Sequence, residues 1–131
     1  MDYEKLISLA NEVKQNAYAP YSNFHVGAAL ITNSGKIYTG TNVENASYGA
    51  TICAERTAIV KAVSEGEKKI KAIAISSDSE DYIYPCGICR QVILEFAADD
   101  LVIICSNNKG EYKVFNINEI LPHAFVFKKN Y

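Results

Sequence analysis

Apolar side chains near the N-terminus recur every three or four residues, which is the spacing of one face of a helix. The positions that share this spacing are Leu6, Leu9, Ala10, Val13 and Ala17. The pattern predicts an amphipathic helix over residues 2–18. Asp2 is suited to cap the start of this helix, and Pro20 is suited to end it.

The following segment contains two strand-like runs and a turn signal. Residues 24–32 and 36–43 both combine apolar and β-branched side chains, and residues 33–35, with the sequence Asn-Ser-Gly, lie between them. This arrangement predicts a β-hairpin. Residues 53–64 then predict a second helix, which ends near Gly66.

The middle of the chain again places a helix between two apolar runs. Residues 70–76 are typical of a buried strand. A polar loop over residues 78–84 leads to a short helix predicted over residues 86–97. Residues 101–105 predict another buried strand.

The C-terminal part predicts one more hairpin and a last short helix. Residues 107–110 form a turn signal, residues 111–115 alternate as in a strand, and Asn116 with Glu119 resembles a capping box. Helices interleaved with strands indicate an α/β domain of three layers. Because two of the turns are tight, we expect a mixed sheet of five strands with helices on both faces, in a single domain over residues 1–131.

The composition favours a folded protein and disfavours a nucleic-acid binder. Hydrophobic residues make up 49% of the chain, which is enough for a packed core, and the formal net charge is −2. Nucleic-acid binders normally carry a basic stripe. Here the basic residues are spread thinly, and the densest cluster is Lys68, Lys69 and Lys71. We therefore expect no nucleic-acid partner.

The sequence also disfavours membrane association and secretion. No apolar run approaches the length of a membrane helix, and the N-terminus is polar from Asp2 to Lys5, unlike a signal peptide. A cytoplasmic location is the expectation that follows. In a reducing compartment, four cysteines are more often metal ligands, catalytic groups or core residues than disulfides.

Two cysteine-containing segments lie at the predicted starts of two helices. The first is Cys53–Arg56, and the second is Pro85–Gln91, in which Cys86 and Cys89 are three residues apart. Residues at this spacing share one end of a helix, and helix N-termini favour thiolates. If the two starts converge, three thiolates meet and leave a fourth position for water, as in a catalytic zinc site. Zinc makes such a water a nucleophile near neutral pH.

Glu55 and Arg56 complete the chemistry expected there. Glu55 follows Cys53 by two residues and is not needed as a ligand, and a carboxylate in that place can take a proton from water and deliver it to a substrate. Three thiolates exceed the charge of Zn²⁺ and weaken its Lewis acidity. We expect the Arg56 guanidinium to offset the excess through hydrogen bonds to the sulfurs.

Each feature has a plainer explanation when it is taken alone. A lone Cys-x-x-Cys is often a redox pair or half of a structural zinc site, but a structural site needs a fourth Cys or His. Cys105 lies in an apolar run, where a core thiol is the commoner role, and His25 and His123 are isolated. Cys-x-Glu together with Pro-Cys-x-x-Cys at two helix starts is, by contrast, highly specific.

These motifs resemble those of the cytidine deaminase family in its short, homotetrameric form. The matching segments are Tyr18–Ser22, Phe24–Ala29, Asn42–Tyr48, Cys53–Arg56, Pro85–Gln91 and Leu121–Phe125. The resemblance implies one zinc ion per subunit, held by Cys53, Cys86 and Cys89, with Glu55 as proton shuttle. It further implies water attack at C4 of cytosine in cytidine or 2′-deoxycytidine, with release of ammonia, in pyrimidine salvage.

The same resemblance implies the residues that bind a small-molecule nucleoside. Phe24 would stack on the pyrimidine ring, and Asn42 and Glu44 would bond the ribose 3′-hydroxyl. Backbone groups around Ala54 would hold the base edge together with Glu55. On the residues alone, core packing is the preferred explanation of Phe24, and a polar loop after a strand explains Asn42 and Glu44 equally well.

Two further aromatic residues have a role only in an assembly. The resemblance implies that Tyr48 and Phe125 reach the active site of a neighbouring subunit, in a homotetramer with sites at its interfaces. Without the resemblance, Phe125 is typical of core packing. The sequence assigns no role to Tyr82 or Tyr84.

Three alternatives stand beside a nucleoside deaminase. A deaminase of a cytosine-containing antibiotic such as blasticidin S resembles the chain in both zinc segments, but Asn42, Glu44 and Arg56 favour the nucleoside enzyme. A polynucleotide deaminase would more often use His as its first ligand and carry basic residues for the strand. A non-catalytic zinc-binding module would not need Glu55.

Overall fold

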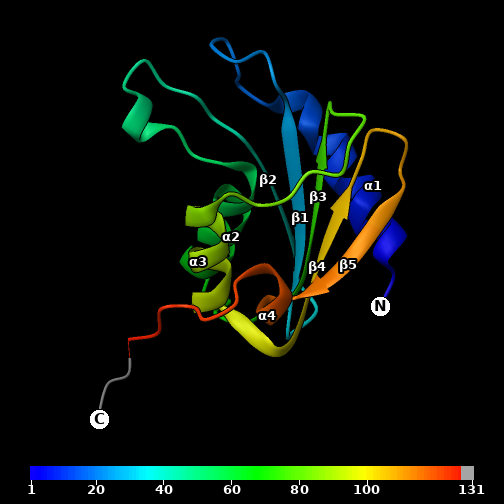
Figure 1. Cartoon of the computed structure of the whole chain (residues 1–131), viewed down its shortest axis with the longest axis vertical. Coiled ribbons are helices and arrows are strands. Elements are labelled where there is room, and N and C mark those ends of the chain that lie inside the picture. The colour runs from blue at the N-terminus through cyan, green and yellow to red at the C-terminus, as the bar shows by residue number, and fades with distance from the viewer. Residues whose placement is uncertain (128–131) are drawn as a thin grey trace.

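A five-stranded sheet runs through the centre of the structure, a computed structural model that describes residues 1–127 (Figure 1). Its strands are β1 (Val26–Thr32), β2 (Ile37–Thr41), β3 (Ile70–Ser77), β4 (Ala97–Ser106) and β5 (Tyr112–Asn116). They lie in the order β2-β1-β3-β4-β5, and β3 and β4 are the parallel pair among antiparallel neighbours. The mixed five-stranded sheet is therefore confirmed. Residues 128–131 of the expected 1–131 domain lie outside the described residues.

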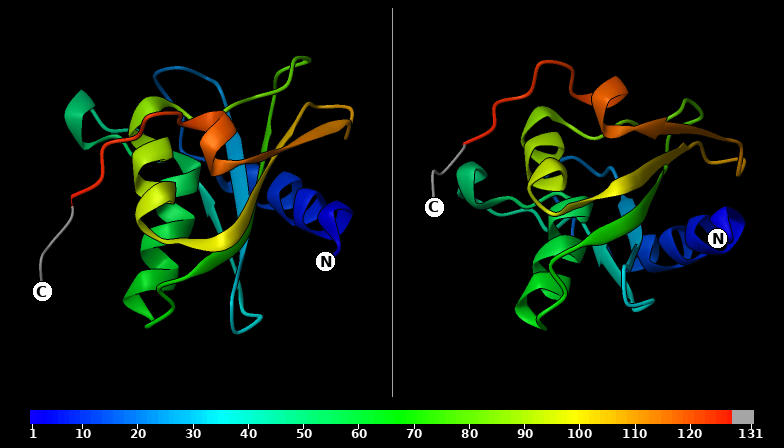
Figure 2. Two further views of the ribbon diagram at one scale, coloured as in Figure 1. Left: turned by 60° about the horizontal axis from the view of Figure 1, so that its bottom comes forward. Right: turned by 90° about the horizontal axis from the view of Figure 1, so that it is seen from below.

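The helices cover both faces of this sheet, as predicted (Figure 2). Helix α1 (Tyr3–Val13) lies on one face, and α2 (Ala54–Ser64) and α3 (Gly87–Glu95) lie side by side on the other. The short α4 (Ile117–Ile120) contacts β4 and β5. The larger apolar cluster fills the space between the sheet, α2 and α3, and a smaller one lies under α1. Among the described residues, no helix has the length and apolar character needed to cross a bilayer.

Two glycines let helices approach the sheet very closely. A Cβ atom at Gly40 of β2 would lie 2.5 Å from the Ala58 nitrogen of α2, and one at Gly27 of β1 would lie 2.0 Å from the Ala10 oxygen of α1. No larger residue fits either place without movement of backbone. The position of α2, which carries Glu55, is therefore fixed by direct contact with β2.

The N-terminal helix is shorter than the predicted 2–18. Asp2 caps it as expected, with its side chain accepting from the Lys5 N–H at 3.0 Å. The α-helix ends at Val13 and tightens into a 3₁₀ turn over Lys14–Asn16. The reason is long-range: the Tyr18 N–H donates to the carbonyl of Asn42 at 3.1 Å, so the chain there is held extended.

The boundary between α3 and β4 was also predicted wrongly. The expected helix over 86–97 ends at Glu95, and β4 begins at Ala97 rather than at Leu101. Ala97 pairs with Ile70 of β3 in the parallel ladder, and this pairing overrides the helical preference of the local sequence. The hairpin turn with Gly35 at φ +89° and the capping box at Asn116 are confirmed.

Candidate active site

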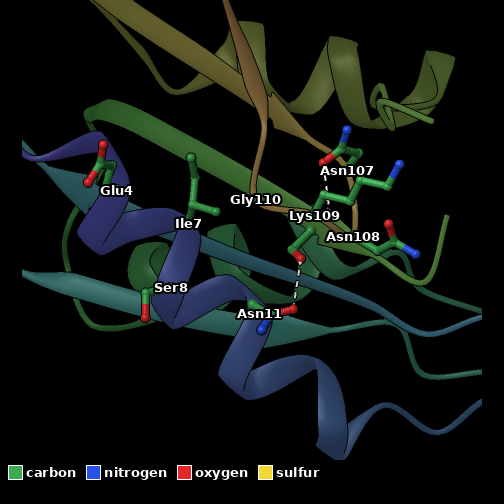
Figure 3. Close-up of a pocket in the computed structure, with 9 residues that line it drawn as sticks. Glu4, Ile7, Ser8, Asn11, Asn107, Asn108, Lys109 and Gly110 are labelled. Atoms are coloured by element: carbon green, nitrogen blue, oxygen red, sulfur yellow. Dashed lines mark hydrogen bonds between the residues drawn. The ribbon is translucent and has the colours of Figure 1, made fainter. Parts of the chain in front are cut away.

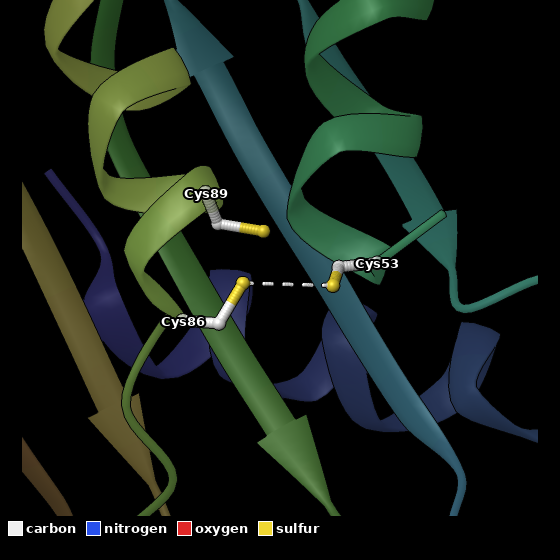
Figure 4. Close-up of side chains that lie close together, drawn as sticks. All are labelled: Cys53, Cys86 and Cys89. Atoms are coloured by element: carbon white, nitrogen blue, oxygen red, sulfur yellow. Dashed lines mark hydrogen bonds between the residues drawn. The ribbon is translucent and has the colours of Figure 1, made fainter. Parts of the chain in front are cut away.

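Three cysteine sulfurs lie together where α2 and α3 begin (Figure 4). Cys53 is the N-cap of α2, Cys86 is the N-cap of α3, and the buried Cys89 lies in the first turn of α3. Their Sγ atoms all lie within 4.8 Å of one another, and those of Cys53 and Cys86 are 3.8 Å apart. The predicted convergence of two helix starts is therefore confirmed.

The spacing of the sulfurs fits a zinc ion. Two Zn–S bonds of about 2.3 Å at the tetrahedral angle place their sulfurs about 3.8 Å apart, which equals the distance between Cys53 and Cys86. All three cysteines are free thiols. The fourth, Cys105, is buried in β4, and burial raises its pKa to about 12, so the prediction of a core thiol is confirmed.

Arg56 lies against the cysteine cluster, as predicted. Its Nη2 is 3.6 Å from the Cys53 sulfur and 3.5 Å from the carbonyl oxygen of Thr51. The pKa of Cys53 is lowered to about 5, mainly by a hydrogen bond from the Cys89 thiol. Burial opposes this shift, and the Arg56 guanidinium adds to it. The guanidinium is thus placed to balance thiolate charge.

Glu55 is the buried carboxyl group of the site. It is 5% exposed and follows Cys53 in the first turn of α2. Burial, with a smaller contribution from the neighbouring Cys53 thiolate, raises the pKa of Glu55 to about 7. A carboxyl group perturbed in this way beside a cleft is typical of catalytic sites.

A cavity of about 290 Å³ opens beside these groups. The residues that form its walls are Ser22, Phe24, Val26, Asn42, Glu44, Thr51, Ile52, Cys53, Ala54, Glu55, Ile83, Tyr84 and Cys86. Four chain segments contribute to it: the loop before β1, the loop after β2, the start of α2 and the loop before α3. The structure therefore brings Phe24, Asn42, Glu44 and Ala54 together with Glu55 and the cluster.

Asn42 and Glu44 already hold the loop that carries Phe24. The Asn42 side chain accepts from the Val26 N–H at 3.0 Å and donates to the Phe24 carbonyl at 2.8 Å. Glu44 accepts from the Ser22 hydroxyl and from the N–H groups of residues 21 and 22, and the Ser22 bond is the main cause of its lowered pKa. One N–H of Asn42 and further lone pairs of Glu44 stay available to a ligand.

Tyr48 and Phe125 do not line the cavity. The Tyr48 side chain is 78% exposed at the projecting loop after β2, and its ring lies 6.1 Å from that of Tyr21. Phe125 is 69% exposed, and its carbonyl oxygen accepts from Gln91 of α3. Within one chain, neither ring reaches the cysteine cluster.

The sequence reasoning missed one wall of the cavity. Ile83 and Tyr84 line it from the loop before α3. The Tyr84 ring lies 5.8 Å from that of Phe115 on β5, and the Lys113 ammonium lies 4.6 Å from the ring centre of Tyr82. Adjacency to Pro85 and Cys86 was the only available signal for Tyr84.

A second cavity, of about 430 Å³, lies between α1 and the turn after β4 (Figure 3). Its walls are polar and include Glu4, Asn11, Ser76, Asn107 and Lys109. None of the predicted site residues lines it, so the chemistry belongs to the smaller cavity beside the cysteines.

Comparison with known proteins agrees with this geometry. A family model described as the cytidine and deoxycytidylate deaminase zinc-binding region matches residues 1–105. The chain belongs to this deaminase family. It carries the family's zinc-binding domain, and the cluster of Cys53, Cys86 and Cys89 can hold one metal ion.

Three members of the wider set of cytidine and related deaminases illustrate the similarity. A cytidine deaminase of Sporosarcina psychrophila is 47% identical over 125 residues, which cover 95% of this chain and 92% of that protein. The crystal structure of cytidine deaminase from Burkholderia pseudomallei matches with a TM-score of 0.91 and 46% identity, over 95% of this chain and 100% of that one. A blasticidin-S deaminase of Bacillus cereus is 34% identical over 126 residues, or 90% and 88% of the two chains.

Proposed function

We propose that this chain hydrolytically deaminates cytidine and 2′-deoxycytidine, in pyrimidine salvage. Water adds at C4 of the cytosine ring, the bond from C4 to the amino nitrogen breaks, and ammonia leaves with a carbonyl in its place. The observation that carries the proposal is the cavity whose walls include Glu55, Cys53 and Cys86 together. The cytidine deaminases that the chain resembles support the same substrate.

Cys53, Cys86 and Cys89 would hold the zinc, which when bound supplies a Lewis acid that lowers the pKa of water towards neutrality. Glu55, buried beside this cluster, would accept the proton of the attacking water on its carboxylate. It would then deliver a proton to the substrate, so that the amino group leaves as ammonia. Arg56 would keep the excess thiolate charge from opposing the reaction.

The other walls would orient the nucleoside. Phe24 offers an apolar ring that can stack on the pyrimidine, and the backbone at Ala54 can bond the base edge. The free N–H of Asn42 and the carboxylate of Glu44 would bond the ribose hydroxyls. In this arrangement Asn42 and Glu44 both shape the pocket and contact the sugar.

The inventory of charges favours a free nucleoside over a nucleotide. The described walls contain the carboxyl groups of Glu44 and Glu55 and neither lysine nor arginine. A 5′-phosphate needs cations or a cradle of backbone donors, and an uncompensated buried charge costs roughly several kcal/mol. We therefore expect discrimination of more than about a hundredfold against 5′-monophosphates.

We also propose a cytoplasmic homotetramer of a single cytidine deaminase domain over residues 1–131. The exposure of Tyr48 and Phe125 supports it, because each would gain a role only at a neighbouring subunit's site. Four free cysteines suit a reducing compartment. Sedimentation should report a mass near four times 14.5 kDa, and an active monomer would refute the assembly.

The test is a comparison of substrates on purified, zinc-loaded protein. Cytidine and 2′-deoxycytidine should lose the cytosine absorbance and release equimolar ammonia, whereas cytidine 5′-monophosphate should react more than about a hundredfold less efficiently. Blasticidin S is included as the competing substrate. Preference for blasticidin S, or equal use of the monophosphate, would overturn the assignment.

A further inference from the structure

His25 lies behind the cavity, between two residues that line it. Phe24 and Val26 are cavity residues, whereas His25 is not. Side chains alternate along extended chain, and a Cβ at Gly27 would meet the Ala10 oxygen of α1. His25 therefore belongs to the face of the sheet that α1 covers, opposite the ring of Phe24.

Asp78 holds His25 through both its backbone and its ring. The Oδ2 atom of Asp78 accepts from the His25 N–H at 2.9 Å and lies 2.7 Å from the ring Nδ1. In return, the Asp78 N–H donates to the His25 carbonyl at 3.2 Å. These contacts continue the β1–β3 ladder past its last strand pair, Val26 with Ser77.

The surroundings of Asp78 add charge to this pair. Partial burial opposes ionisation of Asp78, but the two bonds from His25 and the nearby Lys14 outweigh it, and the pKa of the carboxyl lies below its ordinary value. Lys14 Nζ lies 3.7 Å from Oδ1, the other carboxylate oxygen. The His25 and Asp78 side chains are 36% and 40% exposed, so their contribution to overall stability is small.

The pair completes the restraints on Phe24. On the cavity side, the Phe24 carbonyl is held by Asn42, and its N–H donates to the Ser22 hydroxyl at 3.1 Å. On the far side, the N–H of the same peptide group, which belongs to His25, donates to Asp78. Without this second restraint, the chain at Phe24 would be fixed from one face only.

We propose that His25 and Asp78 are positioning residues, which set the place of Phe24 from the opposite face of the sheet and thereby the affinity for the pyrimidine ring. The inference rests on the proposed function, because it assigns the pair to the same nucleoside pocket. It concerns binding of the ring and leaves the proton transfer and the metal site unchanged. Its signature is a change in KM at constant kcat.

The experiment compares His25→Ala and Asp78→Ala with the wild type. Each should raise KM for cytidine about threefold to tenfold, the range that corresponds to the net contribution of a hydrogen bond, while kcat and zinc content stay constant. The dissociation constant of uridine, measured by calorimetry without turnover, should rise by the same factor. The double variant should be no worse than Asp78→Ala alone, because loss of Asp78 already removes both bonds from His25.

Two further variants serve as rescue and control. His25→Asn keeps a donor near the position of Nδ1 and should restore most of the affinity. Lys68→Met removes an exposed cation just before β3, at the opposite end of that strand from Asp78, and should leave KM unchanged. Wild-type affinity in His25→Ala, or a parallel fall in kcat and zinc content, would overturn the inference. A wild type that neither deaminates cytidine nor binds uridine would overturn the proposed function as well, so the two failures are distinguishable.

Discussion

Replacing Gly40 by alanine tests whether the contact of β2 with α2 sets the metal site. The added Cβ would lie 2.5 Å from the Ala58 nitrogen, 2.8 Å from the Ala54 oxygen and 2.9 Å from the Thr57 Cβ. An ordinary contact needs at least 3.4 Å, so strand and helix must separate by about 0.9 Å, the difference between 3.4 and 2.5 Å. Overpacking of this kind costs about 1–3 kcal/mol of stability.

The same movement reaches the chemistry, because Cys53 and Glu55 lie at the start of α2. Zinc ligands tolerate deviations of only about 0.2 Å, and a misplacement near 1 Å can lower activity by about a hundredfold. We therefore expect Gly40→Ala to lose zinc affinity and to lower kcat/KM for cytidine about a hundredfold. Metal analysis, steady-state kinetics and urea unfolding of the purified variant measure the three effects.

Gly27→Ala is the matched control. Its Cβ would lie 2.0 Å from the Ala10 oxygen, so the clash is at least as severe, but it pushes on α1, which carries neither a cysteine nor Glu55. This variant should lose at least as much stability and keep its zinc. A folded Gly40→Ala protein with a full zinc content and normal kcat/KM would refute the argument.

Three more substitutions test individual groups. Glu55→Gln should keep the fold and zinc while turnover falls by about 10²–10⁴, and near-normal steady-state rates would contradict the proton shuttle. Arg56→Ala should lower zinc retention or activity more than Lys68→Ala at the exposed surface, as metal analysis and kinetics would report. Hydrogen bonds from Ser34 and Thr32 lower the pKa of Glu67. The contribution of ionised Glu67 to the stability of the fold is therefore complete above the ordinary carboxyl pKa, and it is lost as the pH falls through the lowered pKa of the folded state. Urea midpoints of Glu67→Gln should therefore depend less on acid pH than those of the wild type, and equal dependence would refute this.

Two local features of the metal cluster could be predicted from the sequence, whereas the approach of Cys53 to Cys86, which are 33 positions apart in the chain, was implied by the resemblance. Cys86 and Cys89 are one helical turn apart, and the start of α2 at Cys53 follows from the pattern of its own segment. The mixed sheet was also predictable from local signals, because its tight turns contain glycines such as Gly35 and Gly110, which both adopt positive φ.

The features that were missed depend on partners distant in the chain. The start of β4 at Ala97 is fixed by Ile70 of β3, which no local pattern of residues 97–100 reveals. The Tyr84 wall follows from its contact with Phe115 on β5. Likewise, the pairing of His25 with Asp78 could not be read from an isolated histidine.

The hydrogen bonds of Asn42 and Glu44 to the loop before β1 limit how this pocket can change in evolution or in the laboratory. Any substitution of Glu44 that alters sugar selectivity also removes the hydrogen bond that holds the backbone N–H of Ser22. Higher affinity for a new sugar is therefore coupled to weaker restraint of the loop before β1. Ile83 and Tyr84 line the same cavity. Among the described residues, their side chains form no hydrogen bond to the backbone of another segment. Libraries aimed at new nucleosides should therefore yield more functional variants at these two positions than at Asn42 or Glu44.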